Sequence, residues 1–276
     1  MSSIKERQQR AAARAKLERE MAARKEAAAR KRKNLWIAAS AGAAVLVVAA
    51  GVLIAINLLG NDDDESTNSP IAAGTTTCAW NAAPDQGQGT TVDVGMPPAS
   101  ASNVGKSVMI VTTNFGAVEV NLDKTKSPCA IESFTYLSGK KFFDGTKCHR
   151  MFPGMLQCGD PSAKGEGYRE TDGTGGPAYR YSNEYLPTTD IPPYPAGVVA
   201  LANSGADGTN GSQFFFIYED TELSPDYTII GKVTDAGLAV LKKATEKGHD
   251  GAFDPSPGGG HPKEDINIQT VTVAAA

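Results

Sequence analysis

Apolar and polar positions follow different patterns along the 276-residue chain. Residues 1–34 consist almost wholly of Ala, Arg, Lys, Glu and Gln, and Glu–Arg pairs four residues apart favour a solvent-exposed helix. Residues 35–59 carry no charge and contain only Ser40 and Asn57 as polar side chains. As a helix this run measures roughly 37 Å, enough to cross a hydrocarbon layer of about 30 Å. We predict a basic helix over 1–34 and one transmembrane helix over 35–59.

The charges on either side of the apolar run predict its orientation. Residues 1–33 hold 12 Lys or Arg and 4 Asp or Glu, whereas the remainder holds 15 and 27. The positive-inside rule then predicts a single-pass cell-membrane protein with a cytoplasmic N-terminus and an extracytoplasmic main domain. A cleaved signal peptide is the alternative, although its apolar region usually has about 7–15 residues. Contact of the basic head with RNA or anionic lipid also stays open, whereas the acidic remainder argues against nucleic-acid binding by the main domain.

The residues after the apolar run separate into a linker and a domain. Residues 60–106 are rich in Thr, Ser, Gly, Pro and Asp, which predicts a mostly irregular extracytoplasmic linker. Within it, Cys78 and Trp80 indicate that this part docks on the domain. Residues 107–276 alternate short apolar runs with turns and two helical patterns, which favours a closed antiparallel β-barrel capped by two helices. The predicted elements are a hairpin over 107–122, helices from 128 to about 137 and over 236–247, and strands over 147–151, 155–158, 197–201, 214–217, 228–233 and 266–273.

Four cysteines, all beyond the apolar run, suggest two disulfide bonds in an oxidising compartment. Three connectivities are possible. Cys148 and Cys158 flank a predicted hairpin, which favours their pairing and leaves Cys78 for Cys129. A metal site built from Cys148, His149, Cys158 and Asp160 is the alternative, but the chain has no CxxC pair or spaced histidines.

Common catalytic motifs are missing from the sequence. The glycine-rich stretches 173–176 and 205–211 lack the Gly-Lys-Ser/Thr ending that holds a nucleotide phosphate. No GxSxG or HExxH motif occurs either. We expect no metal and no cofactor.

Five segments together point to a family. They are Phe142–Arg150, Pro153–Pro161, Gly173–Pro177, Ala202–Gly205 and Asn210–Phe215. In this order and spacing they resemble the cyclophilin family of peptidyl-prolyl cis-trans isomerases, from about Val108 to Val273, and the basic head, single span and cysteine-bearing domain look like the membrane-anchored cyclophilins of actinobacteria. The resemblance implies an eight-stranded closed barrel with a peptide groove on its outer face. It also implies an enzyme that accelerates X–Pro bond rotation in unfolded, exported or cell-envelope polypeptides. A proline-peptide-binding or chaperone module with little turnover is the alternative.

The resemblance also implies residue roles. Arg150 would be the catalytic side chain, because its guanidinium can reach the prolyl nitrogen or carbonyl as imide conjugation is lost, and Gln157 would hold that guanidinium in place. The proline ring would lie against Phe215, Met155 and Leu223. Further groove positions would be Ala202, Asn203, Gln213, Gly173 and Tyr227. From residue type alone, apolar side chains in strands are more often plain core, and Arg150 could be a surface residue.

Three departures from the family pattern affect the groove. The segment Met155-Leu156 is one residue shorter than usual and lacks the usual aromatic wall, which Phe152 could replace. Glu222 stands where an aromatic residue usually lies, and Tyr227 replaces the usual groove histidine. Glu offers cyclosporin neither an apolar face nor an indole N–H, so weak cyclosporin binding is expected.

Overall fold

The computed structural model describes residues 73–83, 90–187, 192–221, 223–255 and 257–276. The chain separates into two compact units, Met1–Ser69 and Pro70–Ala276, and all described residues belong to the second. The helix and the span predicted over 1–59 lie outside the described residues. Among the residues that are described, no helix has both the length and the apolar character needed to cross a membrane.

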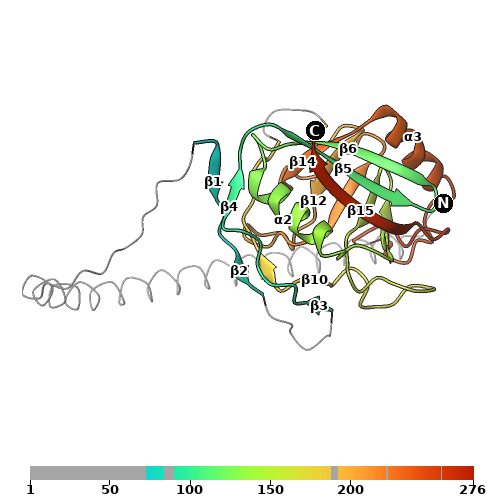
Figure 1. Ribbon diagram of the computed structural model, residues 1–276. Coiled ribbons are helices and arrows are strands. Elements are labelled where there is room, and N and C mark those ends of the chain that lie inside the picture. Colours follow the sequence, from blue (N-terminus) through green and yellow to red (C-terminus); the bar gives the residue numbers. More distant parts are fainter. Residues whose placement is uncertain (1–72, 84–89, 188–191, 222, 256) are drawn as a thin grey trace, which may run out of the picture. The chain divides into compact units, whose positions relative to one another are not determined.

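A nine-stranded curled half-barrel forms the body of the unit (Figure 1). Its strands follow the order β7-β15-β5-β6-β14-β12-β13-β9-β8. All of its strand pairs are antiparallel. The strand bounds are β5 Lys106–Thr113, β6 Gly116–Asp123, β7 Thr146–Lys147, β8 Arg150–Phe152, β9 Met155–Cys158, β12 Val198–Leu201, β13 Phe214–Ile217, β14 Ile229–Val233 and β15 Asn267–Ala275.

The closed eight-stranded barrel is not confirmed. β7 and β8 form the two ends of the hydrogen-bonded sheet, and no ladder joins them within the described part of the chain. Both overlap the run predicted as one strand over 147–151. The chain changes partner within this run, because Cys148 N–H donates to the carbonyl of Ile266 and His149 N–H to that of Gln157. One strand is therefore split into two edges that face different neighbours.

The hairpin over 107–122 is confirmed, because β5 and β6 pair directly from Lys106–Asp123 to Thr113–Gly116. Alternate residues of both strands, such as Met109, Val111 and Val120, are fully buried. This follows from the period of two in a strand, which sends successive side chains to opposite faces.

Strands β12 and β13 are buried on both faces, and this creates the setting of the site. Phe214 and Phe216 pack in the main core inside the half-barrel, together with Val199 and Leu201. The intervening Phe215 belongs to a second apolar cluster on the outer face, which includes Met155, Tyr194, Val198, Ala200 and Ile217. The continuous apolar run of β13 therefore contributes alternate side chains to two apolar clusters, one on each face of the sheet.

Two helices of the described chain pack on the sheet, α2 Pro128–Gly139 and α3 Asp235–Ala244. Helix α2 starts with Pro128 and receives its cap from far away, because the Glu184 carboxylate accepts the N–H groups of Cys129 at 3.0 Å and Ala130 at 2.8 Å. Helix α3 is capped locally by the Thr234 hydroxyl, which accepts the Gly237 N–H. Both helices begin within one residue of the predicted positions, and α3 ends three residues early.

The described part of the linker is mostly irregular, but short strands tie it to the domain. Strands β1 Thr75–Thr77 and β4 Ser100–Ser102 pair with each other, β2 Asn81–Ala82 pairs with β11 Tyr179–Arg180, and β3 Thr91–Val92 pairs with β10 Gly176–Pro177. The disulfide pairing favoured from the sequence, Cys78–Cys129 and Cys148–Cys158, is confirmed. These bonds remove the thiolates that the alternative metal site needs, so that alternative is wrong.

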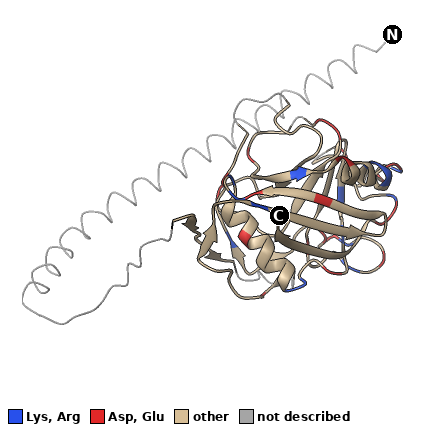
Figure 2. Ribbon diagram, turned by 45° about the horizontal axis from the view of Figure 1, so that its top comes forward, with Lys and Arg blue, Asp and Glu red and all other residues tan. Residues whose placement is uncertain are grey.

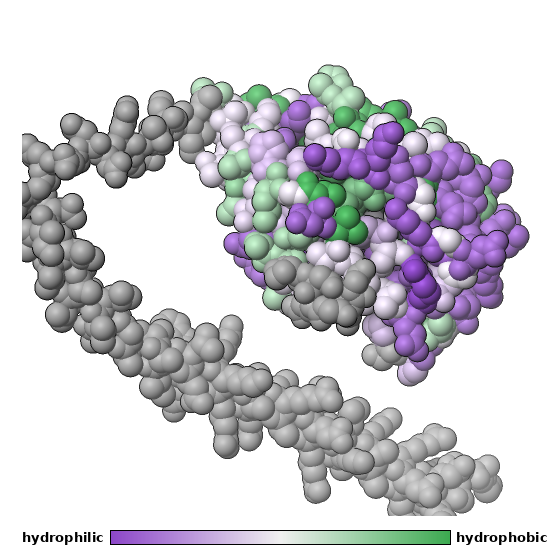
Figure 3. All heavy atoms as spheres, turned by 60° about the horizontal axis from the view of Figure 1, so that its bottom comes forward, coloured by the Kyte–Doolittle hydropathy of each residue, from purple (hydrophilic) through white to green (hydrophobic). Residues whose placement is uncertain are grey.

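Figures 2 and 3 show how charged and apolar residues are distributed on the faces in view. Figure 2 shows Lys and Arg interspersed with Asp and Glu along the ribbon. On the face in Figure 3, hydrophobic side chains form small patches among hydrophilic ones. On this face the described residues form no broad apolar surface, and local pockets are the features that suggest chemistry.

Candidate active site

Two neighbouring pockets lie on the outer face of β9, β12 and β13. The Arg150 pocket has a volume of about 310 Å³ and is lined by Arg150, Phe152, Met155, Gln157, Ala202, Asn203, Phe215, Leu223, Tyr227 and Pro257. The Arg180 pocket has a volume of about 360 Å³ and is lined by Gln157, Gly173–Gly176, Arg180, Ala202–Ser204, Thr209 and Gly211–Gln213. Eight of the ten predicted site residues line the first pocket, and the other two, Gly173 and Gln213, line the second.

The floor of the Arg150 pocket is the outer apolar cluster. Phe215 is 3% exposed, and its ring meets the edges of Tyr227 at 5.3 Å and Tyr194 at 6.1 Å between centroids. Phe152 lies directly opposite Met155 across the β8–β9 pair, and both line the pocket. Phe152 is thus an aromatic side chain at this side of the pocket, and its role as the wall that the shortened segment lacks stays a prediction.

Arg150 is anchored at one corner of this pocket by main-chain carbonyls. Its Nη2 donates to the carbonyl oxygens of Gly258 at 3.1 Å and Pro257 at 3.3 Å. The Nε atom is buried and, like Nη1, has no acceptor among the described residues. Burial lowers the pKa of the Arg150 guanidinium, which Tyr227 partly opposes. The side chain is therefore a fixed cation with unused donors beside an apolar floor.

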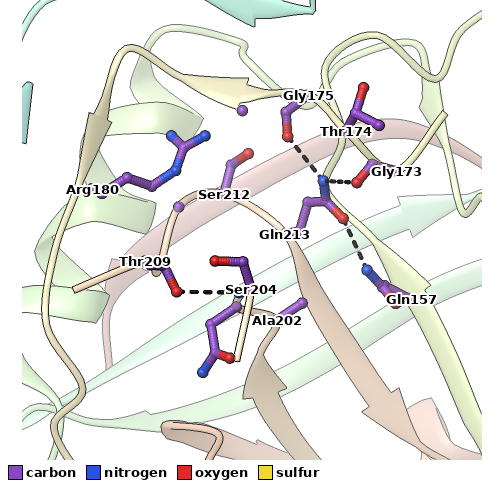
Figure 4. A pocket seen from close by; sticks show the side chains of 13 residues that line it. Gln157, Gly173, Thr174, Gly175, Arg180, Ala202, Ser204, Thr209, Ser212 and Gln213 are labelled. Atoms are coloured by element: carbon purple, nitrogen blue, oxygen red, sulfur yellow. Dashed lines mark hydrogen bonds between the residues drawn. The ribbon is translucent and has the colours of Figure 1, made fainter. Parts of the chain in front are cut away.

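Gln157 makes a different contact from the one expected. Its Nε2 donates to Oε1 of Gln213 at 2.9 Å, while Gln213 Nε2 donates to the carbonyls of Gly173 at 2.8 Å and Gly175 at 2.9 Å (Figure 4). No hydrogen bond joins Gln157 to Arg150 among the described residues, although the two are direct partners in the β8–β9 register. The two glycine carbonyls fix the Gln213 amide so that its oxygen faces Gln157.

The segment at Asn203 leaves main-chain groups available. The Asn203 side chain is occupied, since Nδ2 donates to the Asp226 carbonyl and Oδ1 accepts the Gly205 N–H, both at 2.9 Å. Its main-chain N–H and C=O make no hydrogen bond within the described ranges, whereas Ala202 N–H donates to the Gln213 carbonyl. An extended peptide could therefore pair with Asn203 while its side chains enter the pockets.

The sequence of this region matches a known family. The profile of "Cyclophilin type peptidyl-prolyl cis-trans isomerase/CLD" matches residues 108–273, more than half of the chain. The chain belongs to this cyclophilin family. Similar proteins include the probable peptidyl-prolyl cis-trans isomerases B of Mycobacterium leprae (39% identity over 191 residues, 64% of this chain and 59% of that protein) and Mycobacterium tuberculosis H37Rv (36% over 190 residues, 64% and 56%). Peptidyl-prolyl cis-trans isomerase B of Streptomyces anulatus is 33% identical over 180 residues, 58% of this chain and 93% of that protein.

The comparisons also define how far the likeness extends. The chain spans less than two thirds of the length of the two mycobacterial proteins. A crystal structure of a Cryptosporidium parvum cyclophilin covers 62% of this chain and 99% of its own, with a TM-score of 0.51 and 24% identity, and supports the fold.

A buried histidine lies beneath the cyclophilin site. Burial lowers the pKa of His149 to about 4, which Asp160 and Asp172 oppose. Both ring nitrogens are buried without a hydrogen-bond partner among the described residues, and a Cβ on Gly173 would approach the ring to 3.1 Å. The ring is therefore neutral near pH 7 and packs under the Gly173 loop.

The predicted site residues do not include every residue that lines the pockets, and Pro257 and Arg180 are two that no motif or pattern indicated. Pro257 lies in a Gly/Pro-rich stretch whose pattern carries no signal for a site. Arg180 belongs to a two-residue strand that no periodicity reveals. Only the return of distant loops to β9 and β13 brings them to the pockets.

Proposed function

We propose that this cyclophilin is a peptidyl-prolyl cis-trans isomerase whose substrate proline occupies the Arg150 pocket. The observation that carries the proposal is the juxtaposition of a fixed guanidinium, with unused donors, and an apolar floor centred on Phe215. A proline ring fits an apolar pocket of about 310 Å³. A cationic donor beside this pocket can stabilise the X–Pro amide as it twists.

The proposed reaction breaks no covalent bond. Rotation about X–Pro passes through a twisted imide with a barrier of about 18–20 kcal/mol, in which the prolyl nitrogen regains its lone pair. The free N–H groups of Arg150 stabilise that nitrogen or the carbonyl as conjugation is lost. Phe215, Met155 and Leu223 hold the ring, and Asn203 pairs with the substrate main chain. Gln157 acts with Gln213 to keep the wall between the two pockets in place. No metal or cofactor is required for these steps.

The activity is tested by measuring exchange between cis and trans isomers of a neutral X–Pro peptide by NMR, which avoids a coupling protease. The full chain should make exchange much faster than the uncatalysed reaction, which takes tens of seconds. Binding of the peptide without acceleration would refute the proposal and support the alternative, a proline-binding module with negligible turnover.

We also propose that the enzyme acts on exported or cell-envelope proteins from a membrane anchor formed by residues 35–59, with residues 1–34 in the cytoplasm. The two disulfides support an oxidising compartment for the domain. Protease added to intact cells should remove the region from Cys78 to Ala276 and spare the head. Protection of the whole chain would contradict this orientation.

Weak cyclosporin binding is proposed on the identity of Glu222, which lies outside the described residues. Covering a carboxylate with an apolar macrocycle is unfavourable, and Glu provides no broad apolar contact. Glu222→Trp should lower the inhibition constant at least about tenfold, equivalent to roughly 1–2 kcal/mol of aromatic contact. Nanomolar inhibition of the unmodified chain would contradict the proposal.

A further inference from the structure

Arg180 projects into the second pocket because of the alternation of strand β11 and its continuation. Its neighbours Tyr179 and Tyr181 are buried on the core side, and both rings meet Trp80 edge-on, at 5.5 and 5.3 Å between centroids. Successive side chains of a strand point to opposite faces, so Arg180 faces the outside, where it lines the pocket. In Figure 4 it lies across the pocket from Gln213.

The guanidinium is held in place before any ligand arrives. Nη1 donates to the carbonyls of Pro177 at 2.6 Å and Tyr179 at 2.8 Å. It packs between two glycines, since a Cβ on Gly176 would lie 3.2 Å from Nη2 and one on Gly211 would lie 3.5 Å from Nη1. The linker fixes the strand that carries Arg180, because β2 pairs with β11 and β3 with β10.

The charge of Arg180 is not neutralised within the described part of the chain. Its guanidinium forms no ion pair there, and Nε and Nη2 have no acceptor. The described lining of the pocket contains no Asp or Glu, while Thr174, Ser204 and Thr209 contribute hydroxyl groups. A planar guanidinium with two unused donor atoms matches a carboxylate in charge and geometry.

The two pockets are contiguous, since Gln157, Ala202 and Asn203 line both. An extended peptide advances about 3.3 Å per residue, and because the pockets share these lining residues, a peptide with its proline in one pocket can place a nearby side chain in the other. We propose that Arg180 is a specificity-determining residue that makes this enzyme prefer substrates with Asp or Glu within three residues of the proline. This inference rests on the proposed isomerase function.

The test uses pairs of neutral-ended peptides that differ only by Glu or Gln at one position within three residues of a single proline. Exchange catalysis by the full chain is measured by NMR for each pair, and the ratio of kcat/KM for Glu over Gln is the readout. At one position the ratio should be about tenfold, and it should fall as NaCl is raised, because the contact is ionic. Arg180→Gln should bring the ratio to about one, and Arg180→Lys should leave it intermediate, since the charge remains but the fork is lost. Lys243→Gln removes the same charge from an exposed position on α3 and should leave the ratio unchanged.

The outcomes separate this inference from the proposed function. Acceleration of the Gln peptides with a ratio near one at every position would overturn the role of Arg180 and leave the isomerase proposal intact. A tenfold ratio that survives Arg180→Gln would also overturn it. No acceleration of any peptide by the unmodified chain would instead refute the isomerase function.

Discussion

Replacing Arg150 by Ala is the perturbation that addresses the proposed chemistry most directly. The change removes the guanidinium from the pocket, including the Nη1 donors that have no acceptor among the described residues. Loss of a donor that acts on developing charge typically costs about 10²–10³-fold in rate, or roughly 3–4 kcal/mol of transition-state stabilisation. The fold should survive, because the variant gives up only the hydrogen bonds to the Pro257 and Gly258 carbonyls, about 1 kcal/mol each.

The assay is NMR exchange of an X–Pro peptide together with a separate peptide titration. If Arg150 acts on the transition state, kcat and kcat/KM should fall together while the dissociation constant of the peptide stays nearly constant. Arg150→Lys should recover only a small part of the rate, since a point charge replaces a planar fork. Lys243→Ala is the control for loss of a long cationic side chain, because Lys243 is exposed on α3 and does not line the Arg150 pocket.

Two results would refute this reasoning. One is near-normal turnover by Arg150→Ala with an unchanged urea midpoint. The other is a rise in KM alone, because that would mean that Arg150 binds the ground state and transition state equally.

Three further perturbations follow from the structure. The free energy of unfolding should fall by about 2–3 kcal/mol as the pH drops from 7 to 4.5, because the pKa of His149 is about 4 in the folded protein and 6.5 for an exposed ring. The unfolded chain therefore binds more protons over this pH range. In His149→Gln, the free energy of unfolding from urea titrations should depend less on pH, and an equal pH dependence would contradict the assignment. Phe215→Ala should lower the free energy of unfolding by about 3–5 kcal/mol and also weaken proline-peptide binding. Phe214→Ala, in the main core, should lower stability by a similar amount and leave the peptide affinity of the folded protein unchanged. Equal effects of the two variants on peptide affinity would argue against Phe215 as the floor of the Arg150 pocket. Replacing Cys78 and Cys129 together by Ala should lower stability by up to about 4 kcal/mol, since the bond closes a loop with a sequence separation of 51, and an unchanged thermal midpoint would show that the linker contributes no such constraint.

Local patterns determined the elements that depend on local interactions. The β5–β6 hairpin, strand Phe214–Ile217 and the start of α2 at Pro128 lie where the alternation and the proline predict them. Of the ten site residues predicted from the family-like motifs, eight line one pocket. Their roles stay predictions, because position alone does not measure catalysis.

Contacts between distant segments could not be read in the same way. The cap of α2 comes from Glu184, 55 residues beyond Cys129, and Gln157 is held by Gln213, 56 residues away, instead of by its strand partner Arg150. Nothing in the neighbouring sequence encodes such pairs, because they depend on how loops return to the sheet.

The sequence by itself determined which residues alternate, where the chain turns, and that its motifs are those of a cyclophilin, because periodicity and motif spacing are properties of the chain before it folds. Tertiary structure decided that Phe215 faces the outer pocket while Phe214 and Phe216 face the core, and that the half-barrel has two edges where a closed barrel was expected. It also decided that Arg180, which no pattern in the sequence singles out, lines a pocket contiguous with the Arg150 pocket, because linker strands β2 and β3 pair with β11 and β10. Strand pairing joins residues by register in space and not by separation along the chain, so these features exist only in the folded protein.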